Sequence, residues 1–147
     1  MKKILVSACL AGKCCRYDGT AKPDEKVIRM VQEKRAVCAC PETMAGLRIP
    51  RPPAEIRGGD GDDVLQKRAC VYNKEGKNIT KEFLDGAEKF LDFTLRGGFE
   101  EVWLKAKSPS CGVTKIYDGS FSGRLRDGCG VTCAMLRKNG IRVVEVP

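Results

Sequence analysis

The sequence contains no histidine among its 147 residues. This absence excludes acid–base catalysis by imidazole, Ser-His and Cys-His nucleophilic pairs, and zinc sites that combine cysteine with histidine. Any proton transfer must therefore use a carboxylate, an amine, a hydroxyl, a thiol or water. Any metal must be held by thiolates or carboxylates.

The chain also lacks any apolar run near the ~20 residues that a membrane-spanning helix needs. The N-terminal MKKILVSACLAG is only briefly apolar, and CCRYDG follows it instead of the small-residue cleavage site of a signal peptide. We interpret this segment as a strand and expect a cytoplasmic protein. The length is typical of one domain, so we expect residues 1–147 to form a single domain.

Cysteine, in contrast, is abundant, with nine in the chain. An odd number cannot all pair as disulfides, and in a reducing compartment such enrichment favours metal binding or catalysis. There is no CxxC pair of the kind that builds most structural zinc sites. Several of the nine are expected to be small buried residues that only fill the core.

The formal net charge of +8 favours anionic partners. However, the basic residues are dispersed along the chain, and no nucleic-acid-binding motif accompanies them. Nucleic acid is therefore a candidate partner that the sequence does not favour.

Strand-like and helix-like segments alternate along the chain. Such an order predicts a single-domain, three-layer α/β fold with a mostly parallel sheet of about four to five strands. Two long intervening segments, 41–67 and 108–130, are expected to be irregular and functional. The expected strands are Lys3–Cys9, Ala36–Cys40, Glu101–Lys105 and Ile141–Val146, and the expected helices are Asp24–Glu33, Thr80–Arg96 and Val131–Lys138.

Three cysteines stand at or just after the ends of different predicted strands. Cys9 and Cys40 close the first two strands, and Cys111 follows the third by a few residues. The carboxyl ends of parallel strands share one edge of a sheet, where ligand sites form. We therefore expect these three thiols to converge.

Two kinds of thiolate site are compatible with these residues. With Cys15 as a fourth ligand, the site would close around zinc or a cluster and be structural or electron-transferring. With three cysteines, a [4Fe–4S] cluster would keep one iron free to act as a Lewis acid on a substrate atom. The residues alone leave both alternatives open.

A series of motifs runs in order from nearly one end of the chain to the other: SACLAGKCCRYDG, CPE, PRPPAEI, GGDGDDVL, LKAKSPSCG, IYDGSFSG and the GVT…NGI ending. Together they resemble the DUF523 family, which includes thiouracil desulfidases that carry a [4Fe–4S] cluster. The resemblance implies that Cys9, Cys40 and Cys111 are the cluster ligands, with Cys15 near the site as a candidate additional ligand.

The resemblance further implies a non-redox hydrolysis. The free iron would bind the sulfur of a thiolated pyrimidine such as thiouracil, water would attack the ring carbon, and hydrosulfide would leave. Glu42 would be the catalytic acid–base, and Ser108 would relay a proton or hold the substrate. We expect Ser110 and the amides around Gly112 to donate hydrogen bonds to the cluster sulfides.

At position 45, alanine replaces a glycine that is usual in the family, and its methyl group predicts a narrower pocket. The leading interpretation is thus an iron–sulfur-dependent desulfidase acting on a small thiolated nucleobase. The alternative is a non-catalytic metal–thiolate domain that binds zinc or an Fe–S cluster. One form of this alternative has the domain associated with thiolated RNA.

Overall fold

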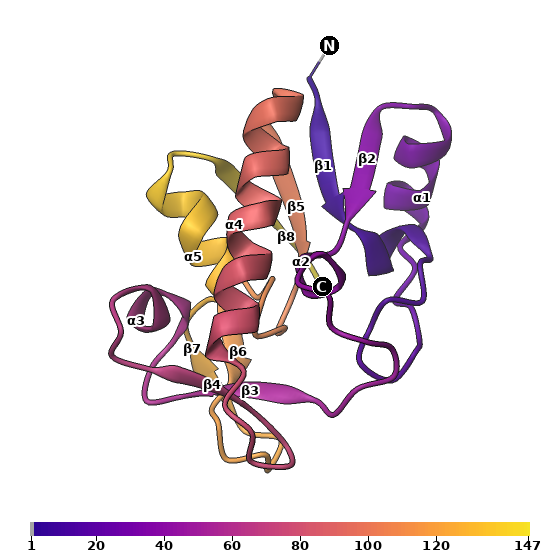
Figure 1. Ribbon diagram of the computed structural model, residues 1–147. Coiled ribbons are helices and arrows are strands. Elements are labelled where there is room, and N and C mark those ends of the chain that lie inside the picture. Colours follow the sequence, from indigo (N-terminus) through magenta and orange to yellow (C-terminus); the bar gives the residue numbers. More distant parts are fainter. Residues whose placement is uncertain (1) are drawn as a thin grey trace.

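A four-stranded parallel sheet forms the centre of the computed structural model, which describes residues 2–147 (Figure 1). The strand order is β2-β1-β5-β8, and every neighbouring pair is parallel. The predicted α/β class and the parallel sheet are confirmed. The bounds are β1 Ile4–Ser7, β2 Ala36–Ala39, β5 Glu101–Lys105 and β8 Arg142–Val146.

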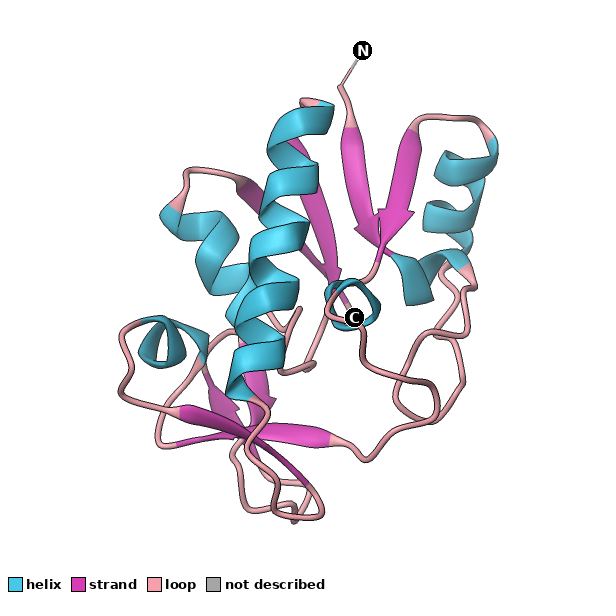
Figure 2. Ribbon diagram, in the orientation of Figure 1, coloured by secondary structure: helices cyan, strands magenta, loops and turns pink. Residues whose placement is uncertain are grey.

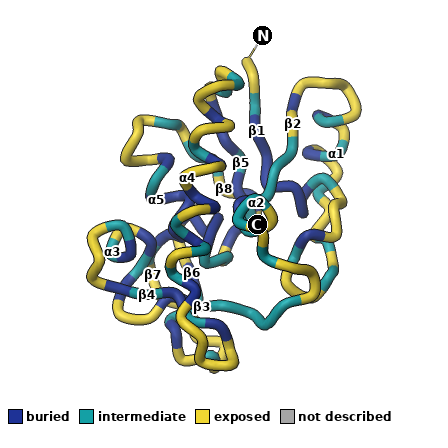
Figure 3. The backbone as a smooth tube through the Cα atoms, in the orientation of Figure 1, coloured by how far each residue is buried: buried dark blue, intermediate teal, exposed yellow. Residues whose placement is uncertain are grey.

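Helices cover both faces of this sheet and make three layers. Consecutive strand residues point to opposite faces, so Leu5 packs into one hydrophobic core and Val6 into the other. The core around Leu5 includes Phe90 of α4 (Thr80–Gly97) and Leu136 of α5 (Val131–Lys138). The core around Val6 includes residues of α1 (Glu25–Gln32) and of the short 3-10 helix Ala8–Ala11. Figure 3 shows that the two central strands, β1 and β5, are mostly buried.

The predicted helices are confirmed nearly to the residue, because local signals set their ends. The Asp24 side chain accepts a hydrogen bond from the Val27 amide and caps α1. Gly98 ends α4 in the left-handed conformation, with a φ of 66°. No helix within residues 2–147 is long and apolar enough to cross a membrane.

The two segments expected to be irregular, 41–67 and 108–130, contain short helices and strands that were not predicted. Figure 2 shows two small antiparallel sheets beyond the carboxyl ends of the parallel strands. They pair β3 with β4 and β6 with β7, and two short helices, α2 and α3, lie in the first segment. The bounds are α2 Pro41–Met44, β3 Ala54–Arg57, α3 Gly61–Leu65, β4 Cys70–Asn73, β6 Lys115–Tyr117 and β7 Leu125–Asp127.

These short elements are stabilised by a third hydrophobic core. It combines Ile56 of β3, Val71 of β4 and Ile116 of β6 with Phe83 of α4. Strands of three or four residues carry too little periodicity to be recognised, because their stability comes from this packing with distant segments. The third core fixes the small sheets at the edge where the cysteines gather.

Candidate functional site

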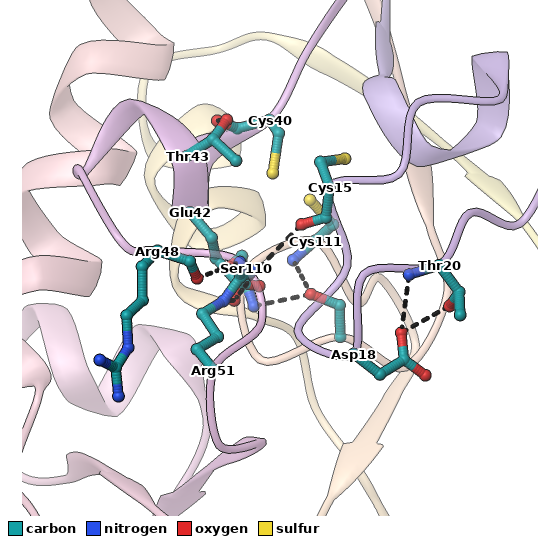
Figure 4. Close-up of polar contacts among 11 residues, drawn as sticks. Cys15, Asp18, Thr20, Cys40, Glu42, Thr43, Arg48, Arg51, Ser110 and Cys111 are labelled. Atoms are coloured by element: carbon teal, nitrogen blue, oxygen red, sulfur yellow. Dashed lines mark hydrogen bonds and ion pairs between the residues drawn. The ribbon is translucent and has the colours of Figure 1, made fainter.

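Four cysteines line one cavity at the carboxyl edge of the parallel sheet. Cys40 directly follows β2, and Cys111 lies in the turn after β5. Cys9 lies in the 3-10 helix after β1 and not, as predicted, in the strand itself. Cys15, from the loop that follows, lines the same cavity. The predicted convergence of Cys9, Cys40 and Cys111 is therefore present, and Figure 4 shows Cys15 close to Cys40 and Cys111.

The thiols of this group perturb one another. For Cys15, contact with Cys40 lowers the pKa, while contact with Cys9 and burial raise it, so that the pKa rises to about 11. Contact with Cys15, followed by burial, raises the pKa of Cys40, and burial raises the pKa of Cys111. These three thiols are thus protonated near neutral pH in the metal-free protein. Binding iron there must release protons, because thiolates are the ligands.

The loop that carries Cys111 is fixed against the start of α5. The Val131 amide donates a hydrogen bond to the Pro109 carbonyl at 2.8 Å, and the Thr132 amide donates one to the Ser110 carbonyl at 3.0 Å. Gly130 allows this close approach, since a Cβ there would lie 2.4 Å from the Ser110 carbonyl oxygen. The Gly130 amide also donates to the Gly112 carbonyl at 2.8 Å, so main-chain hydrogen bonds hold the loop on both sides of Cys111.

Glu42, the predicted acid–base, lies on α2, and its carboxylate has three hydrogen-bond donors. Arg51 donates to Oε1 from Nε at 3.2 Å and from Nη2 at 3.0 Å, and Ser110 donates to Oε2 at 3.0 Å (Figure 4). The Arg51 side chain is only 7% exposed and also donates to the Cys15 carbonyl at 3.0 Å. Arg51 therefore connects the carboxylate with the loop that carries Cys15.

The two serines of the SPSCG motif differ from each other in what they contact. The Ser108 hydroxyl oxygen accepts the amides of Ser110 and Cys111, both at 3.0 Å. The Ser110 hydroxyl donates to Glu42, and the Gly112 amide donates to the Ser108 carbonyl at 2.8 Å. The expectation that Ser110 and the amides around Gly112 donate to cluster sulfides is not met by the Ser110 hydroxyl or by the amides of Cys111 and Gly112, because all three already donate within the protein.

The cavity has a volume of about 460 Å³, which is within the ordinary range for small-molecule sites. Its wall has an excess of positive charge, because it contains six basic residues, Arg51 among them, and two acidic ones, Glu42 and Glu55. Burial lowers the pKa of one of these amines, that of Lys105. Aromatic rings of Tyr17, Tyr117 and Phe121 complete the wall. The other basic residues are Arg16, Lys22, Lys74, Lys105 and Lys107.

The donor set fits an iron–sulfur cluster better than a single ion. Four soft thiols from three separate segments line the cavity beside the carboxylates of Glu42 and Glu55, and thiolates are the ligands that such clusters require. Within residues 2–147, no three Cys, Asp, Glu or His side chains are arranged to hold one metal ion. The geometry therefore gives no support to a closed zinc site with thiolates at about 2.3 Å from one ion.

Several predictions for neighbouring residues change with the structure. Ala45 does not line the cavity; it faces Gly86 of α4, so its methyl group does not narrow the pocket. Cys133 is fully buried in the core, as expected for a filler, whereas Cys14 is exposed and fills no core. Arg51 and Glu55 of the PRPPAEI motif were expected to line the pocket or to hold a proline-stiffened loop, and both line the cavity. Phe121 was missed as a site residue, and the available signal was an aromatic residue within the turn sequence DGSFSG.

Comparisons with known proteins show the family and the fold of this chain. The profile of the family described as 2-thiouracil desulfurase matches residues 4–146. The uncharacterized protein YbbK of Bacillus subtilis (strain 168) is 46% identical over 142 residues, which are 97% of this chain and 94% of YbbK. A solved structure described as the [4Fe-4S]-dependent thiouracil desulfidase TudS (DUF523Vcz) superimposes with a TM-score of 0.87. It is 41% identical, and the match covers 99% of this chain and 91% of that one.

Proposed function

Because the chain belongs to the 2-thiouracil desulfurase family, we propose that it is a [4Fe–4S]-dependent desulfidase. Its substrate would be a small thiolated pyrimidine such as thiouracil, from which it removes sulfur as hydrosulfide by non-redox hydrolysis. The observation that carries this proposal is the single cavity in which Cys9, Cys40 and Cys111 meet the carboxylate of Glu42.

In the proposed site, Cys9, Cys40 and Cys111 hold the cluster and Cys15 lies beside it without binding iron. The assignment is supported by position, since these three follow three adjacent parallel strands and Cys15 belongs to a connecting loop. When bound, a cluster with three protein ligands supplies a Lewis-acidic iron that can polarise a thiocarbonyl.

Glu42 is proposed to take the proton from the attacking water. An ionised carboxylate can accept about four hydrogen bonds, two at each oxygen. Oε1 already accepts two from Arg51, whereas Oε2 accepts one from Ser110 and retains capacity for another. The proton is therefore expected to reach Glu42 at Oε2, where a water bound next to the substrate can donate.

Ser108 is proposed to orient the substrate and not to accept a proton. Its hydroxyl oxygen already accepts two main-chain amides, which use both of its lone pairs. Its hydrogen remains available to donate into the cavity that it lines. The positive charge of the cavity wall would favour binding of anions, including the hydrosulfide product.

The test is product analysis with protein reconstituted anaerobically with iron and sulfide. With 2-thiouracil or 4-thiouracil in H₂¹⁸O, the loaded protein should release uracil and hydrosulfide in equal amounts, with ¹⁸O in the uracil. Protein without iron is the control and should release neither. Failure of the loaded protein to release sulfide from any thiolated pyrimidine would refute the function, and unlabelled uracil would refute the hydrolysis.

A further inference from the structure

Phe121 has an unusual backbone conformation at the wall of the cavity. It lies in the loop between β6 and β7, with a φ of 56°, in the left-handed region that bulky residues rarely adopt. Phe121 also lines the cavity that the four cysteines share. Strained residues of this kind persist only where the surroundings hold them, and they cluster at functional sites.

Two charged residues of β3 hold this loop in place. Oε1 of Glu55 accepts the amides of Gly119 at 3.0 Å and of Phe121 at 3.1 Å. Nε of Arg57 donates to the Gly119 carbonyl at 2.9 Å, and its guanidinium lies 5.7 Å from the centre of the Phe121 ring. Side chains two residues apart on a strand share one face, so both residues of β3 act on the same loop.

The position of Gly119 shows how tightly the loop packs on β3. A Cβ at Gly119 would lie 2.6 Å from the Ile56 carbonyl oxygen, which only glycine avoids. Glu55 is 9% exposed, and a buried carboxylate is unfavourable unless it is hydrogen-bonded. This buried carboxyl group thus fixes the main chain of a surface loop whose residue Phe121 lines the cavity.

We propose that Phe121 is the surface on which the pyrimidine ring of the substrate stacks, with Glu55 and Arg57 as its positioning residues. This inference rests on the proposed desulfidase function. A flat heteroaromatic ring gains affinity from an aromatic side chain parallel to it, whatever substituents it carries. The stack holds the ring in the ground state and the transition state alike, so Phe121 acts on KM and leaves kcat almost unchanged.

The experiment compares variants in the reconstituted protein with 2-thiouracil as substrate. Phe121→Leu keeps an apolar side chain without the ring and should raise KM roughly five- to hundredfold, the range expected for a base–aromatic stack. Phe121→Tyr keeps the ring and should have a KM near that of the wild type. Glu55→Ala should raise KM by a factor similar to that of Phe121→Leu. Glu55→Gln keeps the acceptor oxygen and should have a KM near that of the wild type.

A second measurement does not depend on catalysis. Uracil binding, measured by isothermal titration calorimetry, should weaken in Phe121→Leu by a factor similar to the rise in KM and stay unchanged in Phe121→Tyr. Circular dichroism confirms that each variant is folded. If Glu55→Ala does not fold, the two variants of Phe121 decide the question.

The outcomes separate this inference from the proposed function. If the loaded wild type releases sulfide and Phe121→Leu has an unchanged KM, the stacking role is wrong. If the loaded wild type releases no sulfide, the proposed function is wrong. The stacking role is then judged by uracil binding alone, and equal affinity of Phe121→Leu and wild type would overturn it.

Discussion

Replacing Gly86 by alanine tests whether the contact between α4 and α2 positions the site. Gly86 lies inside α4, where glycine is unfavourable by about 1 kcal/mol relative to alanine. A Cβ there would lie 2.3 Å from the Pro41 carbonyl oxygen and 3.0 Å from the Cβ of Ala45. The first residue of α2 and the residue that ends it are therefore both in direct contact with this glycine.

The expected magnitude follows from the two opposing effects. To reach ordinary contact at 3.4 Å, α2 must move by roughly 1 Å, and overpacking of this kind is unfavourable by about 1–3 kcal/mol. The gain in helix propensity of about 1 kcal/mol offsets part of this cost, so the free energy of unfolding should fall by up to about 2 kcal/mol. Activity should fall more, by roughly a hundredfold, because the same movement displaces Cys40 and Glu42.

The assays are urea unfolding and the rate of sulfide release from 2-thiouracil. Asp85→Ala is the matched control, since Asp85 is the exposed neighbour in α4 and alanine there improves helix propensity without a clash. The control should be as stable as the wild type or slightly more stable, and fully active. A Gly86→Ala protein that gained stability like the control and kept full activity would refute the role of this contact.

Substitutions at two residues test the arrangement around the carboxylate. Glu42→Gln should lower kcat at least about a hundredfold, because the amide cannot take the proton that the carboxylate accepts at Oε2. The iron content should stay unchanged, so kinetics and iron analysis are measured on the same protein. A fully active variant would disprove the acid–base role. Arg51→Met should lower kcat because Oε1 loses both of its donors, and Arg51→Lys should recover only part of the rate. Equal rates for the wild type and both Arg51 variants would contradict the positioning of Glu42 by this arginine.

The sequence predicted the elements whose signals are local. Helix α4 has a continuous apolar stripe and a glycine stop, and its bounds agree with the prediction to within one residue. The convergence of Cys9, Cys40 and Cys111 was also predictable, because parallel strands bring their carboxyl ends to one edge. This part of the site follows from topology and needs no knowledge of side-chain contacts.

The remaining features depend on contacts that a sequence does not display. Glu42 and Ser110 are 68 positions apart, and Glu55 and Phe121 are 66 apart, so neither hydrogen bond has a local signature. Ser110 was therefore predicted to donate to the cluster, although its hydroxyl donates to Glu42. Strands β3 and β6 have four and three residues, and they are stabilised by the core that they share with α4.

Iron analysis of single cysteine variants tests the central claim most directly. After anaerobic reconstitution, the wild type and Cys15→Ala should each bind about four irons per chain with the visible absorption of a cluster. Cys9→Ala, Cys40→Ala and Cys111→Ala should each lose most of this iron. A Cys15→Ala protein without a cluster, or a Cys111→Ala protein with a complete one, would contradict the proposed three-cysteine site with one free iron.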